Sequence, residues 1–323
     1  MKRLSIIFYF ISYYTGVVYL FYFFNRRNQR IFNYHHILPE KFIENNLVYN
    51  YSHSISSFKS QLELIKKRLE PSFQFHKEKS AIITFDDGAL NNYTYAFPIL
   101  QEYDFKSYFF VIEERLSTTE MLWVDKWFLW FSKIPYGSYN ILGVEFVLLN
   151  ENDRTIAHNQ LWSLLRSYYH INDILEVMNQ VYSFDNFKNY IENNIQRFAP
   201  LGVPEIALMK QHGHFIGSHG WKHDVFSLQD KDEIEKELYK IKASSIYNTK
   251  LFAVPFGTDN EINDDVIEII LRCGFDSVLL NQMDVNRGGC YGRINLPNTS
   301  NKYVIEAYLS GLHYFIKTKK LLS

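Results

Sequence analysis

Residues 81–88 read AIITFDDG, and this stretch decides how the fold and the site are read. The apolar run 81–85 has the length of a buried β-strand, and Asp86 and Asp87 follow at its carboxyl end. Two adjacent carboxylates at such a place repel each other unless a cation or a proton lies between them. We therefore interpret one aspartate as a metal ligand and its neighbour as a free base. Taken alone, the same residues also suit an ordinary turn after a strand.

Strand and helix patterns alternate on both sides of this stretch. Short apolar runs typical of strands lie at 31–35, 81–85, 107–112, 215–218, 251–254 and 276–280. Helical spacing of apolar residues lies at 56–69, 93–103, 204–212, 231–247, 263–273 and 302–319. The order strand, helix, strand predicts parallel pairing through crossover helices, so we expect an α/β fold.

Residues 113–203 interrupt the alternation. They show helical patterns at 125–131 and 173–182 and have little Gly, Pro or Ser, so we predict a mostly helical insertion and not a linker. Four of the five tryptophans lie here, namely Trp123, Trp127, Trp130 and Trp162. The sequence leaves open whether they shape a substrate cleft or pack inside the insertion.

A second polar cluster follows the strand predicted at 215–218. His219 and His223 are four residues apart, so a helical segment would place both imidazoles on one face. Zinc commonly takes nitrogen and oxygen ligands of this kind, and a catalytic site leaves one position open for water. Because α/β barrels place active sites at the carboxyl ends of their strands, one Asp and two His form a candidate metal site. We expect His212 and His214 to be structural.

A third motif, AVPFG, covers residues 253–257 and again follows a predicted strand. Pro255 and Gly257 would fix the loop and leave the backbone N–H of Phe256 exposed, as an oxyanion donor must be. An ordinary turn between a strand and a helix is the alternative.

Composition narrows the class of protein. A hydrophobic share of 47% with 21% charged residues is typical of a globular chain. The 34 Lys and Arg nearly cancel the 35 Asp and Glu, so no overall field recruits nucleic acid, and we expect no nucleic-acid partner. Two cysteines, Cys273 and Cys290, cannot build a disulfide framework.

The first thirty residues suggest membrane association. Residues 4–24 are apolar and aromatic and lie between basic flanks. One helix of this length would extend about 30 Å, enough to cross the hydrocarbon core of a bilayer. A helix lying in the membrane interface is equally open, because a stripe of more polar residues falls along one helical face. The stripe comprises Ser5, Tyr9, Ser12, Gly16 and Tyr19.

A cleaved signal peptide is the third interpretation, and the length of the run and the lack of a small-residue cleavage site disfavour it. We therefore divide the chain into a membrane-associated segment, 1–30, and a catalytic domain, 31–323. The basic flanks are nearly balanced, so they do not tell which side of the membrane the domain faces.

Together, the motifs resemble those of the polysaccharide deacetylase family (NodB homology, carbohydrate esterase family 4). TFDDG at 84–88 resembles its first motif, SHGWKH at 218–223 its second and AVPFG at 253–257 its third. Residues 31–35 are similar to an early Tyr-His segment of a permuted subgroup that includes biofilm poly-N-acetylglucosamine deacetylases. The resemblance extends over about residues 30–320, without most of the insertion.

This resemblance implies a distorted (β/α) barrel with fewer than eight strands, one divalent metal, taken to be zinc, and hydrolysis of N-acetyl groups on an amino sugar. Carried over by position, Asp87, His219 and His223 would ligate the metal, and Asp86 would be the general base.

The remaining roles follow from the same resemblance. The N–H of Phe256 would stabilise the oxyanion, and His35 would protonate the leaving amine, with His36 as its rival. Two positions depart from the family pattern: Gly220 replaces a Ser or Thr, and Val254 replaces an Arg that orients the base. Arg293 could supply that guanidinium from another loop.

Three functions remain open at this point. The first is deacetylation of a surface polysaccharide or its lipid-linked precursor, and the second is deformylation of a lipid-linked amino sugar. The third is a non-catalytic glycan-binding protein, which the Gly220 and Val254 departures motivate. The complete ligand set and the base favour an enzyme.

Overall fold

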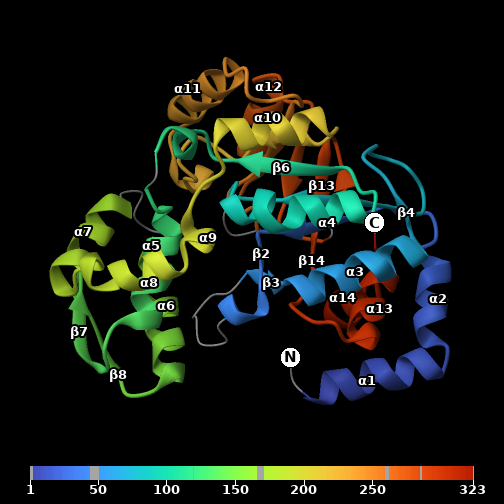
Figure 1. The fold of residues 1–323 in the computed structure, drawn as a ribbon, viewed down its shortest axis with the longest axis horizontal. Helices are drawn as coiled ribbons and strands as arrows, with labels where there is room; N and C mark the ends of the chain where they lie inside the picture. Colours follow the sequence, from blue (N-terminus) through green and yellow to red (C-terminus); the bar gives the residue numbers. More distant parts are fainter. Residues whose placement is uncertain are drawn as a thin grey trace.

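The computed structural model describes residues 3–43, 51–118, 120–165, 171–258, 262–283 and 286–322. In these residues a ten-stranded sheet has the order β12-β13-β11-β10-β9-β6-β5-β1-β14, with β4 paired to β5 (Figure 1). The strands are β1 (Arg30–Tyr34), β4 (Glu70–Pro71), β5 (Ser80–Phe85), β6 (Ser107–Val111), β9 (Phe215–Ser218), β10 (Leu251–Ala253), β11 (Ser277–Leu280), β12 (Asn286–Arg287), β13 (Cys290–Gly292) and β14 (Ile294–Asn295). Every pairing is parallel except that of β12 with β13.

The sheet closes on itself at Arg293. β13 and β14 belong to opposite ends of the strand order, yet Arg293 alone separates them in the chain. β13 pairs with β11 and β14 pairs with β1, so the two short strands act as one interrupted strand that joins the ends of the sheet. The result is the nearly closed, distorted (β/α) barrel that the sequence predicts.

Side-chain alternation along the strands builds two cores. In β1, Ile31 packs with Ile82, Phe110 and Leu279 from other strands, which places these side chains inside the barrel. Its neighbour Phe32 packs outward, in the layer between the sheet and the helices.

The outer helices largely follow the predicted segments. They are α3 (Ile55–Arg68), η2 (Asn92–Ala96), α4 (Phe97–Glu102), α10 (Val203–Gln211), α11 (Lys231–Lys242), α12 (Asp264–Arg272), α13 (Lys302–Ser310) and α14 (Leu312–Thr318). The helix predicted at 231–247 ends early, at Lys242, and the one predicted at 302–319 breaks at Gly311, whose φ of 87° ends an α-helix. Short elements complete this part: η1 (Glu40–Phe42), η3 (Glu113–Ser117), η5 (Phe226–Leu228), and the pair β2 (His36–Leu38) and β3 (Ser52–Ser54).

The insertion forms a lobe beside the barrel (Figure 1). Its helices are α5 (Trp123–Lys133), α6 (Glu151–Leu165), α7 (Ile171–Val181), η4 (Phe184–Phe187), α8 (Lys188–Asn193) and α9 (Ile195–Phe198). A hairpin of β7 (Gly137–Ile141) and β8 (Val144–Leu148), which the sequence reading missed, adds to them. Leu142 and Gly143 both have positive φ, the geometry of a tight hairpin turn, and Ile141 and Leu148 are buried in the core of the lobe.

The N-terminal segment is not one helix, which corrects the prediction for residues 4–24. It consists of α1 (Arg3–Tyr14) and α2 (Val17–Phe24), bent by 78° at a break where Gly16 has a φ of 84°. Within the described residues, no single helix is long and apolar enough to cross a membrane, and α1 and α2 meet that test only as a bent pair.

Candidate active site

Residues that follow the carboxyl ends of β1, β5, β9, β10 and β11 surround one cavity of about 440 Å³. Asp86 and Asp87 follow β5, His219 follows β9, and the loops after β10 and β11 add further lining. The cavity lies where parallel strands of a barrel present their active sites.

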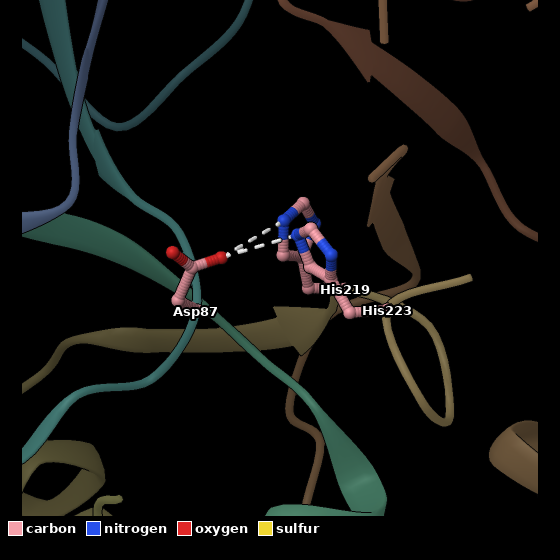
Figure 2. Close-up of side chains that lie close together, drawn as sticks. All are labelled: Asp87, His219 and His223. Atoms are coloured by element: carbon pink, nitrogen blue, oxygen red, sulfur yellow. Dashed lines mark ion pairs between the residues drawn. The ribbon is translucent and has the colours of Figure 1, made fainter. Parts of the chain in front are cut away.

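Three of its side chains could hold a metal ion. Oδ1 of Asp87 lies 3.4 Å from Nε2 of His219 and 3.4 Å from Nε2 of His223, and one ligand atom from each residue lies within 4.8 Å of the others (Figure 2). Oδ1 of Asp87 is buried and has no hydrogen-bond partner in the described part of the chain. A buried carboxylate oxygen without a hydrogen bond, facing two imidazole nitrogens, fits a divalent cation with N and O ligands such as zinc.

The two histidines converge through a loop, not through a helix, and this corrects the helical reading of residues 219–223. Gly220 has a φ of 82° and His223 a φ of 64°, so the backbone turns back on itself between them. The amide of Trp221 donates to Glu237 Oε1 at 2.7 Å, which fastens the loop to α11. A Cβ at Gly220 would lie 3.4 Å from Glu237 and from Pro255, so glycine here serves the turn.

The imidazoles differ in how they are oriented. Nδ1 of His219 donates to the carbonyl of Ala253 at 2.7 Å, which leaves the lone pair of Nε2 directed at Asp87. Nδ1 of His223 is buried and has no hydrogen-bond partner among the described residues. A hydrogen bond that orients the imidazole is therefore present for His219, and none from the described residues orients His223.

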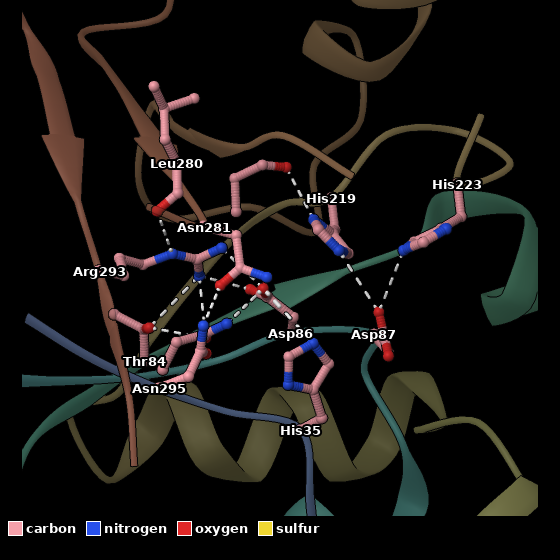
Figure 3. Close-up of polar contacts among 12 residues, drawn as sticks. His35, Thr84, Asp86, Asp87, His219, His223, Leu280, Asn281, Arg293 and Asn295 are labelled. Carbon is pink, nitrogen blue, oxygen red and sulfur yellow. Dashed lines mark hydrogen bonds and ion pairs between the residues drawn. The ribbon is translucent and has the colours of Figure 1, made fainter. Parts of the chain in front are cut away.

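Arg293 and Asn33 hold Asp86. Nη1 and Nη2 of Arg293 donate to Oδ1 and Oδ2 of Asp86, each at 2.7 Å (Figure 3). Nδ2 of Asn33 donates to Oδ2 at 2.9 Å. Burial raises the pKa of Asp86, but the charge and hydrogen bonds of Arg293, together with His219 and His35, lower it by more, and the pKa falls to about 2. Arg293 thus supplies the contact that Val254 cannot make, as its position in another loop suggested.

His35 and His36 face different surroundings. Nε2 of His35 lies 4.0 Å from Oδ2 of Asp86, and its ring is stacked on Tyr51 with 4.5 Å between centroids. His35 lines the cavity, whereas Nδ1 of His36 accepts a hydrogen bond from Asn91 at 3.0 Å outside it. Burial lowers the pKa of both imidazoles. Of the two rivals, only His35 is within reach of a molecule in the cavity.

Phe256 occupies the other side of the cavity. Its φ is 61°, and its ring packs against His223 at 4.8 Å between centroids. Its backbone N–H makes no hydrogen bond to a described residue. Gly257 turns the loop sharply, since a Cβ there would lie 3.0 Å from the amide of Asn281. The loop therefore leaves the amide of Phe256 available to a ligand.

The insertion contributes a wall of the cavity that sequence reasoning did not resolve. Thr155, His158, Asn159 and Trp162 line it from α6, at the spacing of one helical face. The sequence left open whether the tryptophans of the insertion shape a cleft or pack inside it, and both occur. Trp127 and Trp130 are buried in the lobe, whereas Trp162 lines the cavity. The sequence also did not predict three further residues of the site, because no spacing rule links them to the motifs. They are Asn33, Tyr51 and Asn281.

A family profile described as polysaccharide deacetylase matches residues 74–127 and 166–278, a little over half of the chain. The chain belongs to the polysaccharide deacetylase family. Most of the insertion before α7 falls between the two matched segments.

Two solved structures share the fold. IcaB from Ammonifex degensii has a TM-score of 0.54 at 18% identity, with 88% of this chain and 97% of that chain covered. The deacetylase PplD from Streptococcus pyogenes, in complex with acetate, has a TM-score of 0.51 at 18% identity, covering 86% and 97%. At this identity the likeness supports the barrel alone. No curated protein matches the sequence significantly.

Proposed function

We propose that this protein is a metal-dependent hydrolase that removes N-acetyl groups from amino sugars of a surface polysaccharide or of its lipid-linked precursor. One observation carries the proposal: the Asp87, His219 and His223 ligand atoms converge within 4.8 Å beside Asp86, in a cavity that also contains His35. Family membership supports the reaction class. The metal, proposed as zinc, and the N-acetyl substrate are the finer parts of the proposal.

The aspartates have separate tasks. A divalent metal held by Asp87, His219 and His223 would supply a Lewis acid that polarises the acetyl carbonyl and acidifies water. Asp86 is fixed by Arg293 and Asn33, so its carboxylate stays ionised and in place to accept the proton of the attacking water.

His35 and Phe256 complete the proposed reaction. His35 donates a proton to the nitrogen of the leaving amine, and its stacking on Tyr51 holds the ring at the cavity wall. The N–H of Phe256 donates to the carbonyl oxygen as negative charge develops there. Both groups come from loops that the closed barrel brings together, Phe256 after β10 and His35 after β1.

The cavity wall supports a sugar as the substrate. Trp162 lines the cavity with its indole ring, and Asn159 and Thr155 offer hydrogen-bonding groups from the same face of α6. An apolar ring flanked by polar side chains suits a pyranose, which has apolar C–H faces and hydroxyl edges.

Acetate release from N-acetylglucosamine oligomers tests the proposal. The full-length chain is the sample, because α1 and α2 pack on α13 and belong to the folded domain. Chelation should abolish release, and one equivalent of zinc should restore it. Asp86→Asn should lose turnover while it keeps the metal, which separates an enzyme from a glycan binder.

Two results would contradict the proposal. Failure of the chain to bind a divalent metal would rule out the site, and undiminished acetate release by Asp86→Asn would rule out the base. Release of formate but not acetate from matched acylated amino sugars would assign the deformylase activity instead.

A further inference from the structure

The N-terminal helices turn one face toward their own domain, and this face carries the apolar side chains Ile6, Val17 and Phe21 beside the polar groups of Tyr9 and Ser12. Ser5, Tyr9 and Ser12 lie on the stripe that an isolated interfacial helix would turn to water, yet Tyr9 and Ser12 are each only 3% exposed. Tyr9 packs against α13 and α14, in a cluster that also contains Val18 of α2 and Val304 of α13. A surface helix of a soluble protein turns one apolar face to its core and keeps the opposite face polar.

Buried hydrogen bonds fix the pair to the domain. The hydroxyl of Tyr9 lies 2.6 Å from Nδ1 of His313, and that of Tyr22 donates to Oε2 of Glu306 at 2.7 Å. After α2, Nδ2 of Asn25 donates to the carbonyl of Ser310 at 2.9 Å. Because Glu306 is 2% exposed, separating α2 from α13 would remove one hydrogen bond that a buried carboxylate accepts, which is unfavourable. The helices are part of the folded domain.

The opposite face of both helices is apolar and open. Leu4 is 78% exposed, Phe23 58% and Leu20 56%, and Ile7, Ile11 and Phe24 are also more than half exposed. Monomeric soluble proteins rarely expose contiguous apolar surface of this extent without a partner.

The charges around this face are basic. Residues 1–30 contain no Asp or Glu and five Lys or Arg. Arg26 and Arg27 at the end of α2 are exposed, as are Lys319 and Lys320 after α14. The two groups lie at the same end of the pair, because the amide of Leu322 donates to Oδ1 of Asn25 at 3.1 Å. An apolar face with a basic border complements an anionic lipid surface.

We propose that α1 and α2 form a membrane-binding face that holds the whole domain on one surface of an anionic bilayer without crossing it. The 78° bend and the bonds to His313, Glu306 and Ser310 oppose a span, because a straight span would remove α1 from α13. The apolar side chains enter the boundary between headgroups and acyl chains, and the basic residues contact the headgroups. This inference stands apart from the proposed reaction.

Vesicle sedimentation of the full-length chain tests the proposal. Large vesicles of phosphatidylcholine with and without phosphatidylglycerol are compared at low and high salt. The test variant combines Leu20→Ser and Phe23→Ser, which are 56% and 58% exposed. The control combines Leu149→Ser and Val203→Ser, which are 74% and 54% exposed elsewhere on the surface. Thermal unfolding of both variants confirms that each one folds.

Binding should require phosphatidylglycerol, weaken with salt, and fall about tenfold or more in the test variant while the control changes less than about twofold. Alkaline carbonate should release the bound protein. Resistance to carbonate would replace the proposal with a span. An oligomer that the test variant dissociates, with no vesicle binding, would assign the face to a second copy. An equal loss of vesicle binding in the test and control variants would also overturn the proposal.

Discussion

The candidate active-site cavity and the N-terminal helix pair both depart from the usual distribution of polar and apolar side chains, but in opposite ways. The cavity buries charge: Arg293 is fully buried, and Asp86 is 2% exposed. The helix pair exposes apolar side chains, with Leu4 78% exposed and Phe23 58% exposed. A buried charge carries a desolvation penalty, and an exposed apolar face carries a hydration penalty.

The two regions differ in what offsets these penalties. In the cavity the compensation is internal, since Arg293, Asn33 and Asp86 bind one another within the fold. On the helix pair, only a partner outside the chain can cover the exposed apolar side chains, because the inner face of the pair is already bound to α13 and α14. Substitutions in the cavity should therefore affect chemistry and folding together, and those on the outer helix face should affect neither.

The largest expected effect follows removal of a metal ligand. His219→Ala should lower acetate release about a thousandfold or more, because a bound metal contributes several kcal/mol to the transition state. Metal analysis should show the loss of the bound equivalent. His212→Ala is the matched control, since His212 is exposed and outside the cavity. Equal activity of the two variants would remove His219 from the site.

Arg293→Met tests the internal compensation directly. It leaves Asp86 buried and without its cation, so the free energy of unfolding, measured in urea, should fall by about 3–5 kcal/mol. Arg272→Met removes an exposed pair with Glu235 and should cost less than about 1 kcal/mol. A similar fall in the free energy of unfolding of both variants would show that the buried pair of Arg293 and Asp86 stabilises the protein no more than an exposed pair does.

Tyr22→Phe tests whether α2 belongs to the domain. It removes one hydrogen bond to the buried Glu306, so the free energy of unfolding should fall by about 1–2 kcal/mol. Tyr14→Phe removes only an exposed contact with Tyr303 and should change it by less than about 0.5 kcal/mol. No difference between the two would mean that α2 is loosely attached.

The smallest effect concerns the cavity wall on the insertion. Trp162→Ala should raise KM for N-acetylglucosamine oligomers about threefold to tenfold with kcat little changed, because aromatic packing contributes about 0.5–1.5 kcal/mol. Trp162→Phe keeps a ring and should recover most of the loss. A fall in kcat with unchanged KM would place Trp162 in support of His223 or Phe256 instead of the sugar.

The sequence predicted the parts of the site that depend on chain neighbours. Asp86 and Asp87 follow a strand whose apolar run is unmistakable, and His219 and His223 follow another, so their shared edge could be inferred. The sequence-based prediction was wrong where the backbone conformation of a single residue decides whether a helix forms. Positive φ at Gly220 and His223 makes a loop of an expected helix, and Gly16 divides an expected single helix.

The class of fold and the residue types of the candidate metal site could be predicted from the sequence, because local periodicity and short motifs encode both. The closure of the barrel by β13 and β14, the contact of Arg293 with Asp86 across 207 positions, and the inward placement of Tyr9 and Ser12 could be seen only in the folded chain. These depend on long-range packing, which brings together residues that no local pattern connects.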